Sequence, residues 1–177
     1  VIVGLEDLSY NKIIVDAEKV GGKRVFKAKV YSSIIGYRAK LELILKDDGL
    51  IVARIPGSPV DIPIITLMRA LGLESDKEIA SAVSLNDEIQ NELEGSFEKT
   101  EIATSKDAIV YISKRIAPGM LEEFQIKRAE TLLDWGLLPH LGKQPENRKE
   151  KTQFLGEAAC KLLELKLRWI EPDDKDH

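Results

Sequence analysis

The first third of the chain alternates apolar and polar residues with a period of two, which is typical of half-buried antiparallel strands. One such segment has Phe26, Ala28 and Val30 on one side and Lys27 and Lys29 on the other. A second segment follows, and its apolar side consists of Tyr37, Ala39, Leu41, Leu43 and Leu45. Its polar side consists of Arg38, Lys40, Glu42 and Lys46, with Ile44 as the exception.

Turn signals separate these predicted strands. A β-branched run at residues 13–15 comes before Gly21-Gly22, and Asp47-Asp48-Gly49 comes before a further strand at residues 50–55. We expect the two alternating segments to pair with each other through a turn within residues 32–36.

From residue 61 onward the apolar spacing becomes helical. The predicted helices cover residues 61–71, 76–84, 86–93, 105–116, 121–138 and 145–170. We expect Asp76, Asn86 and Ser105 to be N-caps and Gly95-Ser96 to end the third helix. The two longest helices carry apolar stripes: Leu121, Phe124, Ala129, Leu132 and Leu133 in one, and Leu155, Ala158, Ala159, Leu162, Leu163 and Leu167 in the other.

Strands first and helices second predict an α+β fold, with an antiparallel sheet in the N-terminal third and the helices packed against it. We expect one domain over residues 1–177, strand-rich in 1–60, helix-rich in 61–170 and acidic in 171–177. We interpret both ends as cuts in a longer protein, because the chain starts at Val1 and stops within an acidic cluster. A processed native chain is the alternative.

The composition narrows the class of protein. With 44% hydrophobic and 32% charged residues, it is that of a globular protein. The single cysteine, Cys160, excludes an internal disulfide and favours a reducing, cytoplasmic location. No run approaches the roughly 20 apolar residues that cross a bilayer, so no membrane partner is expected.

Charge is unevenly distributed along the chain, although the net charge is only −4. Between residues 19 and 40 the basic residues are Lys19, Lys23, Arg24, Lys27, Lys29, Arg38 and Lys40, and no acidic residue lies among them. Between residues 87 and 101 the acidic residues are Asp87, Glu88, Glu92, Glu94, Glu98 and Glu101, against Lys99 alone. The acidic total argues against a dedicated, tight DNA-binding module, which is usually basic.

The basic strand pair permits two interpretations. If the strands pair, Lys27, Lys29, Arg38 and Lys40 project from the solvent face of the sheet. Long cations on a flat face suit phosphate contacts that position a duplex without reading its sequence. The alternative is an ordinary charged outer face that only keeps the sheet soluble.

The candidates for catalysis or metal binding are weak. His140 lies at a predicted helix end, where a histidine stabilises the last carbonyls and the helix dipole. Cys160 lies on the apolar side of a helix and is interpreted as a buried, inert thiol. The acidic cluster at 173–177 is interpreted as a polar chain end rather than a metal site. Because the phosphate-loop, G-x-S-x-G and H-E-x-x-H spacings are absent, this segment alone is predicted to be inactive.

An ordered set of short motifs in the helical half distinguishes this chain from a generic α+β domain. Ile62-Pro63 leads into a helix that ends in Arg69-Ala70-Leu71-Gly72. The further blocks are residues 105–108 with 112–115, 137–142, 154–156 with 161–164, and 172–177. In order and approximate spacing this set resembles the lobe domain of the second-largest, β-like subunit of archaeal-type multisubunit DNA-directed RNA polymerases.

The resemblance implies that the chain is part of a nucleotidyltransferase that copies DNA into RNA. Such enzymes use Mg²⁺ held by the largest subunit, and their β-like subunit has a zinc site near its C-terminus. Both metals are expected outside this segment, so no cofactor is expected within it. The lobe forms part of one wall of the DNA cleft, and its implied partners are other polymerase subunits, transcription factors and DNA, in weak, sequence-independent contact.

Two functional hypotheses follow. The leading one is a DNA-guiding wall, whose candidate DNA contacts are Lys19, Lys23, Arg24, Lys27, Lys29, Arg38 and Lys40. The alternative is a protein-docking module for a transcription regulator with no direct DNA contact, whose candidate docking residues are Asp87, Glu88, Glu92, Glu94 and Glu98.

Overall fold

The computed structural model describes residues 11–98 and 102–168. Within these ranges, five strands form one sheet in the order β1-β2-β3-β4-β5, and every neighbouring pair is antiparallel. The strands are β1 (Ile13–Val20), β2 (Lys23–Ile34), β3 (Tyr37–Leu45), β4 (Ile51–Arg54) and β5 (Ile62–Pro63). The α-helices are α2 (Ile64–Ala70), α3 (Asp76–Val83), α4 (Asp87–Glu98), α5 (Ser105–Ile116), α6 (Glu122–Thr131) and α7 (Arg148–Lys166). The predicted α+β fold is confirmed.

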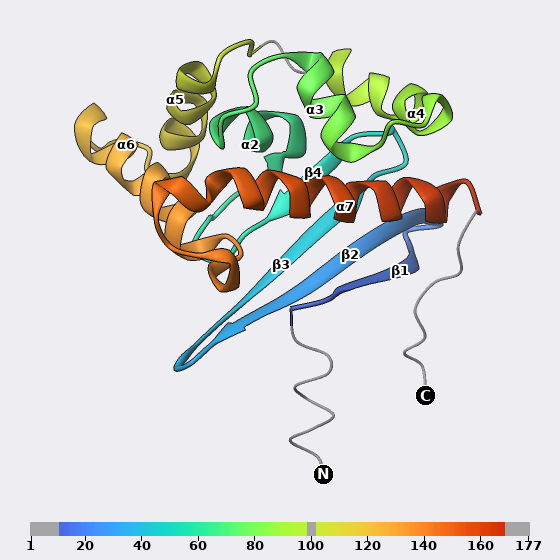
Figure 1. Ribbon diagram of the computed structural model, residues 1–177, viewed down its shortest axis with the longest axis horizontal. Coiled ribbons are helices and arrows are strands. Elements are labelled where there is room, and N and C mark those ends of the chain that lie inside the picture. Colours follow the sequence, from blue (N-terminus) through green and yellow to red (C-terminus); the bar gives the residue numbers. More distant parts are fainter. Residues whose placement is uncertain (1–10, 99–101, 169–177) are drawn as a thin grey trace.

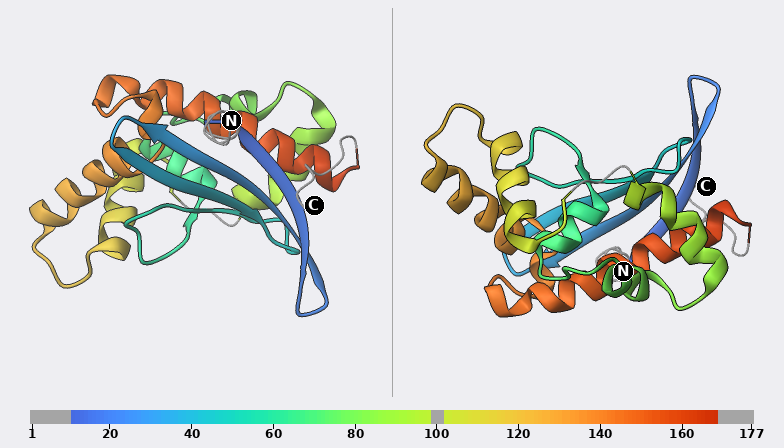
Figure 2. Two further views of the ribbon diagram at one scale, coloured as in Figure 1. Left: turned by 90° about the horizontal axis from the view of Figure 1, so that it is seen from below. Right: turned by 90° about the horizontal axis from the view of Figure 1, so that it is seen from above.

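The helices lie on one face of the sheet (Figure 1). Helix α7 packs mainly on β2 and also contacts β1 and β3, while α2 packs on β4. The view from below in Figure 2 shows the opposite face, which no described helix covers. The β1–β2 hairpin extends past the helices in the same views.

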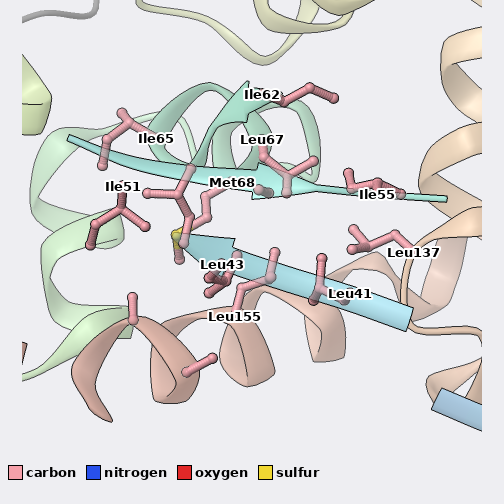
Figure 3. Packing of buried hydrophobic residues seen from close by; sticks show 14 of the residues in the cluster. Leu41, Leu43, Ile51, Ile55, Ile62, Ile65, Leu67, Met68, Leu137 and Leu155 are labelled. Atoms are coloured by element: carbon pink, nitrogen blue, oxygen red, sulfur yellow. The ribbon is translucent and has the colours of Figure 1, made fainter. Parts of the chain in front are cut away.

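The core lies between the sheet, α2 and α7, as the period-two pattern of β2 and β3 predicts. Leu41 and Leu43 of β3 are buried, and Leu155 of α7 packs against them (Figure 3). Every residue of α2 is buried, and Ile65 and Met68 complete the same cluster. Each large aliphatic side chain removed from water in this way contributes about 1.5–3 kcal/mol.

The turns between the first strands are short. Gly21 and Gly22 connect β1 to β2 with φ angles of 59° and 83°, and a two-residue hairpin loop of this type favours glycine at both positions. The β2–β3 turn is tighter than the predicted 32–36 turn, because β2 continues to Ile34 and β3 begins at Tyr37.

The start of the first predicted helix is wrong. Ile62–Pro63 forms β5, which pairs with Val52 and Ala53 of β4, and the helix starts only at Ile64. Pro63 has no N–H to donate to a ladder, which suits it to the edge of the sheet. A strand of two residues is too short to show a period.

The predicted helix caps are correct within one residue. Ser75, rather than Asp76, caps α3, and its hydroxyl accepts a hydrogen bond from the Glu78 N–H. Thr104, rather than Ser105, caps α5. Asn86 caps α4 as predicted, because its side-chain oxygen accepts from the Glu88 N–H at 2.8 Å.

Helix α4 does not end at Gly95-Ser96 as predicted, but continues to Glu98. Ser96 is buried, and its hydroxyl donates to the carbonyl oxygen of Gly49 at 3.1 Å. This contact with the β3–β4 turn favours the helical conformation where the local sequence favours a break.

The predicted helix over residues 121–138 is divided. Helix α6 passes into a π-helix at Leu132–Gly136, and a 3₁₀ turn follows at Pro139–Leu141. Of the predicted stripe, Ala129, Leu132 and Leu133 are buried, but Leu121 and Phe124 are 68% and 50% exposed. The prediction was wrong for these two because Leu121 precedes the first residue of α6, and the buried side of α6 carries Gln125 and Ala129 rather than Phe124.

The last predicted helix begins with a 3₁₀ turn at Pro145–Asn147 and continues as α7. Its stripe from Leu155 to Leu163 is buried as predicted, and Leu167 is half-buried just beyond the helix end. Residues 169–177, which include the predicted acidic end, lie outside the described residues. Of the helices in the described ranges, none combines the length and apolar composition needed to cross a membrane.

Candidate nucleic-acid interface

Strand register places Lys27, Lys29, Arg38 and Lys40 on one side of the sheet. In the β2–β3 ladder Lys29 is opposite Glu42. Side chains alternate between the two faces along each strand, so opposed pairs that are two residues apart share a face. This side, opposite the α7 layer, is called the open sheet face. Its charged strand residues are Asp16, Glu18, Lys23, Lys27, Lys29, Arg38, Lys40, Glu42 and Arg54.

Carboxylates from neighbouring strands lie between these cations. Lys27 Nζ is 3.1 Å from Glu18 Oε2, and Lys40 Nζ is 3.5 Å from Glu42 Oε1. The hydrogen bond from Lys27, with further attraction from Lys29 and Lys40, lowers the pKa of Glu18. The charge of Lys27 is therefore partly neutralised, and six cations share the open sheet face of the strands with three carboxylates.

Arg54 is an open-face cation that was not among the candidates predicted from the sequence. It is opposite Glu42 in the β3–β4 ladder, and its Nε donates to Asp61 Oδ1 at 3.1 Å, which raises the pKa of Arg54. The available signal was its position two residues after Val52 in a predicted strand. Only the register of β4 on β3 shows that this position lies beside the β2–β3 cations.

The remaining predicted DNA contacts lie at the end of the β1–β2 hairpin. Lys19 and Arg24 are opposite each other, and the alternation places them on the other face from Lys27. Lys23 belongs to the open sheet face, but its ammonium group is 3.1 Å from Asp47 Oδ2. The seven predicted contacts therefore do not form one patch: five share the open sheet face and two point the other way.

The predicted acidic docking residues lie on α4, and they differ in exposure to solvent and in their hydrogen bonds. Asp87 and Glu88 are exposed in the first turn, where a negative charge favours the helix dipole. Glu94 is also exposed, whereas Glu92 accepts a 2.7 Å hydrogen bond from Lys166 Nζ of α7. The side chain of Glu98 lies outside the described part of the chain.

His140 has a structural role, but not the predicted role at a helix end. Its Nδ1 is 2.7 Å from the hydroxyl of Ser32, which also accepts from the His140 backbone N–H at 3.0 Å. The ring meets Phe154 edge to face, and burial lowers the pKa of His140. The imidazole joins β2 to the 3₁₀ turn and to α7, so the motif at residues 137–142 is a connection between elements.

Two other motif residues also act structurally. The Arg69 guanidinium is buried and donates to the Glu74 carbonyl oxygen and the Asp76 carboxylate, which joins the end of α2 to the start of α3. Gly156 of α7 lies against α3, where a Cβ atom would collide with the carbonyl oxygen of Ala82.

A charged cluster fixes the π-helix to the start of α7. Arg148 donates two hydrogen bonds to Asp134, at 2.8 and 2.9 Å. Lys151 is fully buried, and its ammonium group donates to the carbonyl oxygens of Leu133 and Asp134 at 2.8 and 2.9 Å. Burial lowers the pKa of Lys151 to about 8.

The thiol and metal candidates gain no support. Cys160 is half-buried rather than fully buried, and burial raises the pKa of its thiol, which disfavours the nucleophilic thiolate. Within the described ranges, no group of three or more His, Cys, Asp or Glu side chains is arranged to hold a metal ion. The acidic cluster at 173–177 lies outside those ranges.

The fold and these contacts define an α+β domain whose motif residues connect structural elements and whose sheet exposes one face of mixed, mainly basic charge. Residues 9–177 match the family described as RNA polymerase Rpb2, domain 2, and the chain belongs to this family.

Individual relatives are similar along the whole chain. DNA-directed RNA polymerase subunit Rpo2 of Saccharolobus solfataricus is 43% identical over 178 residues, which cover 100% of this chain and 16% of the relative. Subunit Rpo2N of Methanocaldococcus jannaschii is 41% identical over 182 residues, which cover 100% of this chain and 36% of the relative. Subunit Rpo2N of Halobacterium salinarum is 36% identical, with 100% and 35% covered. The chain thus spans a minor part of the length of each relative.

Proposed function

We propose that this chain is the lobe segment of a β-like subunit of a DNA-directed RNA polymerase, and that its open sheet face lies along the duplex in the DNA cleft. Similarity to Rpo2 and Rpo2N over the whole chain supports the assignment to the polymerase. The observation that carries the DNA-facing role is the placement of Lys27, Lys29, Arg38 and Lys40 on one face of the sheet that no described helix covers.

The interleaved carboxylates fit a wall that lets DNA move. Ion pairs such as Lys27–Glu18 and Lys40–Glu42 reduce the attraction for phosphates without removing it. A face of this kind holds a duplex weakly and without regard to sequence. On this proposal, RNA synthesis belongs to the assembled cytoplasmic enzyme, and its Mg²⁺ and zinc are held by residues outside this chain.

Charge reversal on the open sheet face tests the proposal. In the assembled polymerase, the variant with Lys27, Lys29, Arg38 and Lys40 all changed to Glu should release DNA from elongation complexes at lower salt. When the logarithm of its DNA-binding constant is plotted against the logarithm of salt concentration, the slope should be shallower by about 0.9 for each phosphate that the variant no longer neutralises. The measurement is the fraction of complexes that retain labelled duplex across a salt series.

The control reverses two exposed lysines on α7, on the other side of the sheet: Lys149→Glu with Lys161→Glu. This variant should retain DNA like the parent enzyme. Equal DNA retention and an equal salt slope for the four-fold variant would mean that the open sheet face only keeps the sheet soluble.

Docking of a basic transcription regulator on α4 is the second candidate function. It is favoured by Asp87, Glu88 and Glu94, which are exposed and make no ion pair within the described part of the chain. Changing these three residues to Lys should abolish crosslinking of such a regulator to the polymerase and leave DNA retention unchanged. Unchanged crosslinking would exclude this surface.

A further inference from the structure

A groove of about 480 Å³ runs between α6, the π-helix and the segment after β4. Pro56, Gly57 and Leu132 form part of its lining, and Phe124 of α6 and Trp135 of the π-helix stand beside them. Neither the DNA-facing role nor the α4 surface uses any of these five residues. The groove is called the α6 groove below.

Large apolar side chains line the α6 groove and remain exposed to water. Phe124 is 50% exposed, Trp135 51%, Met120 46% and Tyr37 37%. Single exposed apolar residues are normal, but several large ones lining one hollow mark a surface for another molecule. Aromatic residues and Met are also enriched where proteins bind one another.

The backbone that carries Trp135 is held in place by its neighbours along the π-helix. The residues before it are anchored to α7, since Lys151 donates to the Leu133 and Asp134 carbonyl oxygens at 2.8 and 2.9 Å. After it, a Cβ atom at Gly136 would lie 3.1 Å from the Pro56 carbonyl oxygen, so the backbone meets the groove lining closely. A binding site on a backbone fixed in this way needs less ordering when it is covered, and π-helices occur frequently at functional sites.

The charged residues that line the α6 groove have one sign. Lys127 and Arg128 line it, and no Asp or Glu is among its lining residues. Neither cation makes an ion pair within the described ranges. Lys143 adds a third positive charge, because its ammonium group lies 4.4 Å from the ring centroid of Trp135. A molecule bound here therefore gains from carrying carboxylates.

We propose that the α6 groove binds an amphipathic protein segment that carries bulky apolar side chains flanked by carboxylates. Given the proposed place in a polymerase, on which this inference rests, the segment belongs to a transcription factor that binds the assembled enzyme. Single-stranded nucleic acid would need open aromatic faces for base stacking. Here the Lys143 ammonium group lies over the Trp135 ring and also 5.3 Å from the ring centroid of Tyr37, and most of the lining residues are apolar.

Binding is tested with a fluorescein-labelled synthetic peptide of about 16 residues, with Leu and Phe at helical i, i+3, i+4 and i+7 spacing and Glu on either side. Fluorescence anisotropy measures its affinity for the assembled polymerase. Met120→Ser with Phe124→Ser should weaken binding at least tenfold, because both side chains lie in the groove. The matched control, Leu85→Ser, alters an 82% exposed leucine elsewhere and should leave binding unchanged.

A charge exchange tests the electrostatic half of the proposal. Lys127→Glu with Arg128→Glu should reject the glutamate peptide and bind a peptide in which each Glu is replaced by Lys. Both residues are on the surface of α6 beside the groove, so the variant is expected to assemble normally. Preservation of peptide binding in both double variants would overturn the proposal.

Other occupants give different results. Preferential binding of an oligo-dT strand, abolished in the Met120 and Phe124 variant, would contradict a protein occupant. Dimerisation of the polymerase that is abolished by the same variant would show that a second copy occupies the groove, and would also contradict it. None of these groove variants alters Lys27, Lys29, Arg38 or Lys40, so the DNA-facing proposal can fail while peptide binding persists, and the reverse.

Discussion

Lys151 illustrates at the scale of one residue how this fold uses a charge in its interior. Its ammonium group is buried and donates to two carbonyl oxygens of the π-helix. Burial lowers its pKa to about 8, and the attraction of Asp134 opposes this shift without cancelling it. Burial therefore favours the neutral amine of Lys151 over the charged ammonium group, while the two carbonyl oxygens still need this nitrogen as their hydrogen-bond donor.

This arrangement predicts a pH dependence of stability. Between pH 8 and about 10.5 the unfolded chain binds a proton at Lys151 more readily than the folded chain, so the Lys151 contribution to the free energy of unfolding rises with pH. Lys151→Met removes this contribution and leaves two buried carbonyls unpaired, which costs about 1–3 kcal/mol at pH 7. Urea unfolding at pH 7, 8, 9 and 10 should show the difference between parent and variant widening.

Lys149→Met is the control, because Lys149 is an exposed residue of the same helix. Its effect on unfolding should be small and should not change over the pH series. A parent–Lys151→Met difference that stays constant from pH 7 to 10 would contradict the lowered pKa.

Single residues could be predicted from sequence where one strand period decides their side. Lys27 and Lys29 alternate with buried Ala28 and Val30, so the period alone places them on the open side of the sheet. Lys151 could not be predicted, because nothing in the sequence distinguishes it from the exposed charges at the start of α7. Its burial depends on the π-helix that it contacts.

Gly156 shows at the scale of an element how closely α7 and α3 approach. An alanine in the middle of a helix normally stabilises it by about 0.5–1 kcal/mol relative to glycine. At Gly156 the added methyl group would collide with the Ala82 carbonyl oxygen of α3. The free-energy cost of this collision exceeds the gain in helix stability, because a backbone carbonyl cannot rotate aside as a side chain can.

Two glycine variants therefore have opposite predicted signs. Gly156→Ala should lower the free energy of unfolding by about 1–3 kcal/mol, as overpacked positions do. Gly95→Ala in α4 should raise it by up to about 1 kcal/mol, because a Cβ there meets nothing within 4 Å. Denaturant titration of both variants measures the difference, and stabilisation by Gly156→Ala would show that the helices are not held at this distance.

Elements were predictable where local pattern and tertiary contact agree. The Gly21-Gly22 turn and the Asn86 cap were predicted correctly because their signals lie within a few residues. The end of α4 was not, because Ser96 binds the distant Gly49 carbonyl. The π-helix was not predicted either, because a distant residue, Lys151 of α7, donates hydrogen bonds to its carbonyl oxygens.

In the whole molecule, the proposed functions depend on surfaces that only the assembled sheet and helices create. The run from Lys19 to Lys40 contains no acidic residue in sequence, yet register places Glu18 and Glu42 beside its lysines. The α6 groove likewise joins Tyr37 at the start of β3 to Trp135. The family was predictable from the motif blocks, whereas the charge balance of the open sheet face required the pairing of β1 and β3 with β2.

Whether the open sheet face lies along DNA is tested by a photo-crosslinking amino acid at position 29, in a polymerase assembled with downstream duplex DNA. Position 149 on α7 serves as the reference. We expect position 29 to crosslink to the duplex and position 149 not to do so. Active elongation complexes in which positions 27, 29 and 40 all fail to crosslink DNA would contradict the claim that this face lies along the duplex.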